Sequence, residues 1–149
     1  MTAKKMKNYV VQSALTLGLL TGGASTAIAA GDDPLFDRLG GMPAITAVVD
    51  QFFVNNFADE RIATRWGTSD LPKLKENISN LICDVTGGPC VYSGSSMEVA
   101  HDGMNITADE FGWTATNLAA TLDSLNVPEP EKGELLAIVG SLQGQIVGK

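Results

Sequence analysis

The spacing of apolar residues is the feature that most restricts how this chain can fold. After residue 30 the apolar residues recur at helical intervals, and no run alternates apolar and polar residues as a half-buried strand does. One apolar face, for example, comprises Ile45, Val48, Val49, Phe52 and Phe53. About 120 residues remain after this point, enough for one hydrophobic core. We therefore expect a single all-α domain.

Glycine and proline residues divide the helical pattern into elements. We expect a short helical turn over 34–39 and helices over 43–57, 72–85, 107–125 and 131–146. Asp70 or Ser69 is expected to cap the helix over 72–85. Thr107 and Glu110 have the spacing of a capping box at the start of the next helix. The segment 87–105 lacks periodicity and is rich in Gly and Ser, so we expect a functional loop there.

The start of the chain is typical of a signal peptide. Three lysines within the first seven residues supply positive charge, and an apolar stretch follows over 10–20. The triplet Ala27-Ile28-Ala29 then offers the small side chains that signal peptidase needs, with cleavage before Ala30. The alternative is an ordinary N-terminal helix, but this run has no polar face. We expect residues 1–29 to be a signal peptide and 30–149 to be the domain of a periplasmic or secreted protein.

Composition restricts the possible partners. Hydrophobic residues make up 44% of the chain and charged residues 18%, which excludes intrinsic disorder. Loss of residues 1–29 leaves seven basic and seventeen acidic residues, a net charge of −10. Such a charge argues against nucleic acid as a partner. No cysteine lies at the cleavage site for a lipid anchor, so we expect no stable attachment to a membrane.

The single histidine, His101, is the candidate metal ligand. A lone histidine is often a surface residue or a hydrogen-bonded core residue, and both alternatives remain open on chemistry alone. A structural zinc site needs about four Cys or His ligands, and this chain has three such residues. No Gly-x-Ser-x-Gly sequence is present for a serine nucleophile. Haem iron differs because it requires only one protein ligand.

Several short stretches carry a resemblance to a known family. They are LFDRLGGMPAI at 35–45, FF at 52–53, FAD at 57–59, TGGP at 86–89, YSG at 92–94 and MEVAHDGMNI at 97–106. In this order and spacing they resemble the group I truncated haemoglobins, and the resemblance extends over 34–149. It implies a shortened globin fold in which two helices pack over two around a haem.

The resemblance also implies roles for individual residues. His101 falls at the position of the proximal ligand of haem b, with its second ring nitrogen donating to a backbone carbonyl. The expected cofactor-binding residues are Phe53, Trp66, Leu74, Ile78, Met97, Ile106, Phe111 and Thr114. Lys73 and Lys75 are candidates for pairing with the haem propionates. Phe53, Leu74, Ile78 and Phe111 also have core spacing and would be buried without haem, and Met97 is a packing candidate as well.

The distal side departs from well-known relatives. Phe53 matches a position where they often have a tyrosine that hydrogen-bonds a bound gas. Trp66 replaces a phenylalanine, and Leu74 and Ile78 are apolar where relatives can be polar. Thr114 is then the nearest candidate hydroxyl. We expect weaker stabilisation of bound O₂ than in relatives that carry the tyrosine.

Three classes of function remain after this comparison. The favoured one is a haem protein that reversibly binds O₂, and also NO or CO, and serves in oxygen binding or transport with an unidentified reductase. The second is a haem enzyme for NO dioxygenation or peroxide reduction, or a redox or gas sensor. The third is a haem-free helical bundle.

The two cysteines, Cys83 and Cys90, are expected to form a disulfide. Cys83 lies near the end of a predicted helix, and Cys90 follows the Gly87-Gly88-Pro89 turn that reverses the chain. A separation of seven residues across such a turn brings two Cα atoms within bridging distance. Export would place both thiols in an oxidising compartment. The alternative is a pair of buried free thiols.

Overall fold

The computed structural model describes residues 33–67 and 70–149, so the predicted signal peptide lies outside the described residues. The helices are α1 (Leu35–Arg38), α2 (Gly41–Ala58), η1 (Ala63–Arg65, a 3₁₀ turn), α3 (Leu71–Val85), α4 (Met97–His101), α5 (Ala108–Ser124), α6 (Glu129–Ser141) and α7 (Gln143–Ile146). Across the described ranges the only β pairing is an isolated bridge between Ile106 and Val147. The all-α prediction is confirmed.

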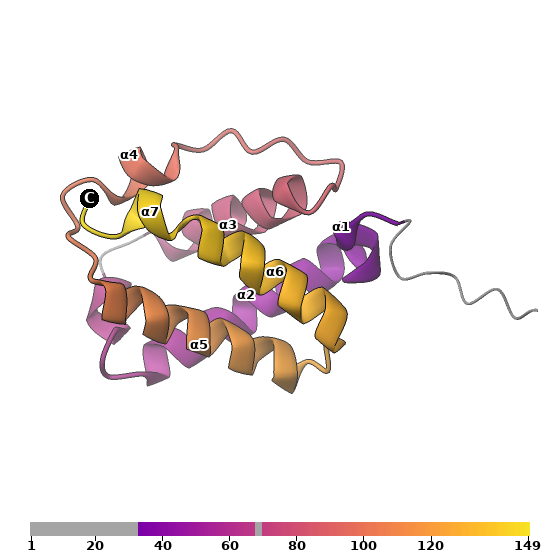
Figure 1. Ribbon diagram of the computed structural model, residues 1–149, viewed down its shortest axis with the longest axis horizontal. Coiled ribbons are helices and arrows are strands. Elements are labelled where there is room, and N and C mark those ends of the chain that lie inside the picture. Colours follow the sequence, from indigo (N-terminus) through magenta and orange to yellow (C-terminus); the bar gives the residue numbers. More distant parts are fainter. Residues whose placement is uncertain (1–32, 68–69) are drawn as a thin grey trace, which may run out of the picture.

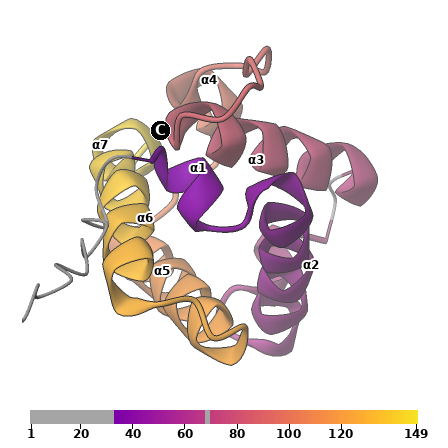
Figure 2. The same ribbon diagram turned by 90° about the vertical axis from the view of Figure 1, so that its right-hand side faces the viewer.

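The long helices pack in two pairs (Figure 1). Helix α2 contacts α3, α5 contacts α6, and α2 also packs against α5 across the two layers. Viewed along the other axis, α1 lies at one end, between α2 and α6 (Figure 2). Arg38 of α1 holds this end closed, with its guanidinium bonded to Glu131 (2.7 Å) and to Glu134 of α6.

The core lies between these pairs, and α2 is its central element. The buried residues of α2 include Ile45, Val48, Val49, Phe52 and Phe53, the apolar face read from the sequence. Residues three or four positions apart share a helix face, so the sequence spacing was sufficient to locate this face. Opposite it lie buried residues of α3, α5 and α6, which are Ile82, Leu118, Leu122 and Leu135.

The predicted caps are confirmed. Asp70 is the N-cap of α3, and its side chain accepts a hydrogen bond from the Lys73 amide. At α5 the Thr107 side chain accepts from the Glu110 amide, and the Glu110 side chain accepts from the Thr107 amide, so the capping box is complete. Each cap satisfies backbone groups that the first turn of a helix leaves without partners.

Helix ends differ from the predicted ones by up to two residues, and two predictions were wrong by more than that. The final helix, expected to be continuous over 131–146, ends at Ser141 and resumes as α7 after Leu142. Gly140 and Gly144 flank this break, and glycine costs about 1 kcal/mol per residue in a helix interior. The expected loop over 87–105 contains α4, whose N-cap is Ser96, and the Ser96 side chain accepts from the Val99 amide.

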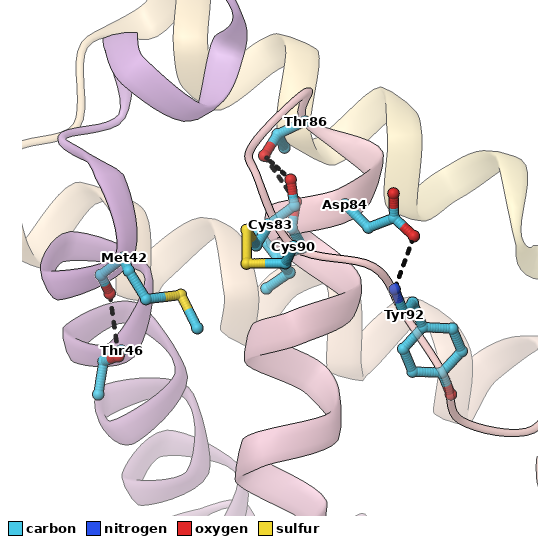
Figure 3. Close-up of a disulfide and its surroundings, with 8 residues drawn as sticks. Met42, Thr46, Cys83, Asp84, Thr86, Cys90 and Tyr92 are labelled. Carbon is cyan, nitrogen blue, oxygen red and sulfur yellow. Dashed lines mark hydrogen bonds between the residues drawn. A yellow bond between two sulfur atoms is a disulfide. The ribbon is translucent and has the colours of Figure 1, made fainter.

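A disulfide joins Cys83, near the end of α3, to Cys90, with a Cα–Cα distance of 5.7 Å (Figure 3). The turn between them depends on glycine at two positions. Gly87 has φ +83°, a backbone angle that residues other than glycine rarely adopt. A Cβ atom on Gly88 would come within 2.8 Å of the Cys83 carbonyl oxygen, so only glycine fits there. Beyond the bridge, the Tyr92 amide donates to Asp84 (2.8 Å). The start of the loop is therefore fixed to α3.

Candidate functional site

A cavity of about 320 Å³ opens between the two helix pairs and the α4 segment. Cofactor sites typically have volumes of this order or larger. Its wall is mostly apolar and includes Val48, Val49, Phe52, Ile62, Leu81, Leu118, Val139, Leu142 and Ile146. Side chains from α2, α3, α5, α6 and α7 thus meet at one hollow.

His101 ends α4 and lines this cavity. Its Nδ1 atom lies 2.7 Å from the carbonyl oxygen of Met97, one helical turn earlier. A carbonyl can only accept, so Nδ1 carries the proton and donates it. The lone pair of the neutral ring is then on Nε2, which is the atom that a metal requires. The short helix α4 therefore fixes both the tautomer and the orientation of the ring.

Most of the predicted cofactor-binding residues come together around this cavity. Those that line it are Trp66, Leu74, Ile78, Met97, Ile106, Phe111 and Thr114. Phe53 is not among the lining residues, and its neighbour Phe52 takes that place. Phe53 is 1% exposed and packs edge-on against Phe52 and Trp66, with ring centroids 5.6 and 5.3 Å apart. It supports the wall from behind.

Neither lysine proposed for the propionates lines the cavity. Lys73 is paired with Glu76 (2.8 Å) one turn along α3. Lys75 is paired with Asp50 of α2 (2.7 Å). Both pairs connect surface groups, so the structure gives these lysines partners that do not depend on a haem.

Sequence reasoning missed Arg65, whose side chain lines the cavity. Its Nε donates to the Glu110 carboxylate (2.7 Å), and its Nη1 donates to the Met104 carbonyl (3.1 Å). Arg65 thus connects the η1 turn to the segment after His101. The bond from Arg65, followed by the one from the Thr107 amide, lowers the pKa of Glu110 from 4.5 to about 2. Arg65 and Glu110 are 45 residues apart, so no local pattern could have paired them.

Asn77 and Tyr92 were also missed as lining residues. A signal for Asn77 was present, because it is three positions after Leu74 and so shares the helix face already assigned to the pocket. Tyr92 was noted only as part of the YSG stretch. Its hydroxyl donates to the Ser95 carbonyl (2.9 Å), which folds the loop beside the cavity.

Two polar groups near the cavity differ in what they can donate. The Thr114 hydroxyl donates to the Glu110 carbonyl of its own helix (2.9 Å), so its proton is already used. The indole Nε1 of Trp66 is buried and has no partner, the only such side-chain atom found among the described residues. An unpaired buried donor is costly, so this N–H is a group that a ligand in the cavity could satisfy.

The sequence model of the family described as bacterial-like globin matches residues 34–147. The group 1 truncated hemoglobin of Mycolicibacterium paratuberculosis is 32% identical over 112 residues, which are 75% of this chain and 82% of that protein. The chain belongs to the truncated haemoglobins, in group 1. The group 1 truncated hemoglobin of Tetrahymena thermophila is 30% identical, over 77% of this chain and 95% of that protein.

Solved structures of truncated haemoglobins are also similar to this chain. The Fe(III) form of the Tetrahymena pyriformis truncated hemoglobin superposes with a TM-score of 0.75 at 30% identity, covering 78% of this chain and all of that one. The 2/2 hemoglobin of a Synechococcus species, in the cyanomet state with covalently attached heme, superposes with a TM-score of 0.70 at 32% identity, covering 76% of this chain and 95% of that one. The two-over-two globin fold is therefore established.

The residues present in this truncated haemoglobin fit a haem. The described parts of the chain contain no group of three His, Cys, Asp or Glu residues that could bind a metal ion without a haem. A haem needs a single imidazole and an apolar slot, and His101 and the mostly apolar wall supply these, with Asn77 and Tyr92 as further lining residues. No helix in the described ranges is both long and apolar enough to cross a membrane.

Proposed function

We propose that this truncated haemoglobin binds haem b through His101 and reversibly binds O₂, and also NO and CO. The observation that supports this most directly is the hydrogen bond from His101 Nδ1 to Met97, which leaves Nε2 with the lone pair beside an apolar cavity. When bound, haem would supply an iron atom with a sixth position for a diatomic gas. The residues of the chain hold the ring, exclude water and set the polarity around that position.

Stand-alone peroxide chemistry is the less favoured function. Peroxide cleavage needs an acid–base group in the pocket. Glu110 is the carboxylate that lines the cavity, but it is held in an ion pair with Arg65 (2.7 Å), so it is not free to transfer protons. Oxygen binding requires no such proton transfer. An unidentified reductase would keep the iron ferrous.

We also infer that the protein is exported and acts in the periplasm or outside the cell. The signal-like sequence over 1–29 and the Cys83–Cys90 disulfide support this, because structural disulfides persist in oxidising compartments.

Absorption spectra of the purified protein test the proposed function. The ferric, ferrous and CO-bound forms should each show a Soret band, with one haem per chain and reversible spectral change on oxygenation. A protein purified and reconstituted without any Soret band would refute haem binding. Turnover of NO or peroxide at rates well above those of free haem would favour the enzyme instead.

A further inference from the structure

The residues that follow α7 lie beside the segment that leads from His101 into α5 (Figure 1). The Asn105 amide donates to the Lys149 carbonyl (2.6 Å), and the Gly148 amide donates to the Ile106 carbonyl (2.9 Å). Next to these bonds, Ile106 and Val147 form an isolated parallel bridge. We call residues 147–149 the clasp, because they hold the segment through backbone bonds to Asn105 and Ile106.

The clasp also reaches the start of α4. The Lys149 ammonium lies 3.2 Å from the carboxylate of Glu98, which is in the first turn of α4. The two side chains are 33% and 62% exposed, so this pair contributes less than the backbone bonds. Helix α4 also packs against α7, from which the clasp extends. The clasp therefore contacts the chain on both sides of His101.

The α4 segment needs support from other parts of the chain. Helix α4 has five residues, far fewer than a helix needs to be stable by itself. The next residues, 102–105, are exposed, and both Gly103 and Asn105 have positive φ angles. Burial of side chains does not fix this segment. The link back to the histidine is one bond, from the Met104 amide to the His101 carbonyl (3.0 Å).

We propose that the clasp is a positioning element for His101. By holding Asn105 and Ile106 in place, it would set the position of the imidazole in the cavity and so the strength with which His101 holds a haem. Arg65 also donates to the Met104 carbonyl (3.1 Å), so Arg65 and the clasp both hold this segment. This inference rests on the proposed haem function.

A matched pair of variants at Gly148 tests the clasp. Gly148→Pro removes the amide that donates to Ile106 and cannot adopt φ +73°. Gly148→Asn keeps the amide and tolerates a positive φ. In a second pair of variants, each substitution removes one positive charge. Lys149→Met removes the ion pair with Glu98 of α4. Lys132→Met is the control, because it removes ion pairs with Asp123 and Glu129, away from α4.

The measurements are amide exchange in the full chain, with and without haem, the haem dissociation rate, and the iron–histidine stretching band of the ferrous protein. Loss of one net hydrogen bond corresponds to about a five- to tenfold change in an equilibrium. We therefore expect Gly148→Pro to accelerate exchange at Met104 and haem loss by about that factor and to shift or broaden the band. Gly148→Asn should resemble the natural protein, and Lys149→Met should change haem loss by more than Lys132→Met does.

The outcomes distinguish failure of the clasp from failure of the proposed haem binding. An unshifted band and unchanged haem loss in Gly148→Pro would overturn the clasp. Equal acceleration at Met104 and at core amides such as Phe53, with an unshifted band, would also overturn it, because the effect would then be general destabilisation. If the natural protein binds no haem, the proposed function fails, while exchange at Met104 still decides whether the clasp orders the segment.

Discussion

The two ring nitrogens of His101 have different environments, and this difference underlies the proposed chemistry. Nδ1 is committed to the Met97 carbonyl, and Nε2 is left to bind iron. No other histidine exists in the chain to substitute for it.

His101→Gly should therefore release haem at least about tenfold faster than the natural protein, since the iron loses its only imidazole. Transfer of haem to an acceptor apoprotein measures the rate. Free imidazole should restore the natural ferrous spectrum, because it fits the space that the side chain leaves. An unchanged spectrum in the variant without imidazole would contradict the assignment of His101.

Trp66 offers a second test at the residue scale. Its Nε1 is a buried donor without a partner among the described residues, and Trp66 lines a cavity whose wall is mostly apolar. If this N–H bonds a polar ligand, Trp66→Phe should accelerate O₂ release by about tenfold and leave CO release nearly unchanged, as loss of a hydrogen bond of about 1–2 kcal/mol predicts. Stopped-flow kinetics give both rates. The control is Trp113→Phe, because Trp113 stacks with Arg61 instead of lining the cavity. Equal rates of O₂ release in the two variants would show that Trp66 Nε1 does not bond the ligand.

At the scale of elements, the disulfide secures the loop that leads to α4. Replacing both Cys83 and Cys90 by Ser should lower the free energy of unfolding by about 2–3 kcal/mol. It should also accelerate haem loss, because the loop before His101 is released from α3. A reducing agent should reproduce both effects in the natural protein and do nothing further to the double variant. Alkylation of two cysteines in the unreduced natural protein, seen by intact mass, would disprove the bridge.

The ion pair between Arg65 of η1 and Glu110 of α5 predicts that the stability of the fold depends on pH. Arg65 lowers the pKa of Glu110 from 4.5 to about 2, so the folded protein binds this proton less readily than the unfolded chain. The stabilisation is therefore complete above about pH 4.5 and is lost as the pH falls towards 2. Glu110→Gln should be less stable than the natural protein at neutral pH, with a smaller decline between those values. Denaturant unfolding measures this, and Glu60→Gln, an exposed site, is the control. Parallel curves for Glu110→Gln and the natural protein would contradict the role of this ion pair.

At the scale of the whole molecule, the proposed export predicts the first residue of the mature chain. Protein recovered from a periplasmic or secreted fraction should begin at Ala30, because the triplet Ala27-Ile28-Ala29 meets the requirements of signal peptidase. N-terminal sequencing checks this. Replacing Ala27 and Ala29 by Leu should leave the uncleaved chain, since bulky side chains do not fit the peptidase. Recovery of the full-length natural protein only from the cytoplasm would contradict export.

Haem binding also belongs to this scale, because the ligand would fill a cavity between both helix pairs. A group that binds the folded state alone raises the midpoint of thermal unfolding, so the haem-loaded protein should unfold at a higher temperature than the haem-free one.

Local patterns in the sequence determined a large part of this protein. Helical spacing identified the buried face of α2, cap residues located the starts of α3 and α5, and Gly87-Gly88 marked the turn between the two cysteines. These signals were readable because each depends on residues within a few positions of one another. The identity of His101 as the candidate ligand followed from its being the only histidine.

Only the tertiary structure decided which side chains share the cavity. Phe52 lines it and Phe53 does not, although both are buried on adjacent positions of one helix, because the rotation of α2 against its neighbours is set by packing. Arg65 meets Glu110 across 45 residues, and Lys149 meets Asn105 across a similar distance in sequence. Contacts of this kind leave no local periodicity, since they form only when separate helices close around a common core.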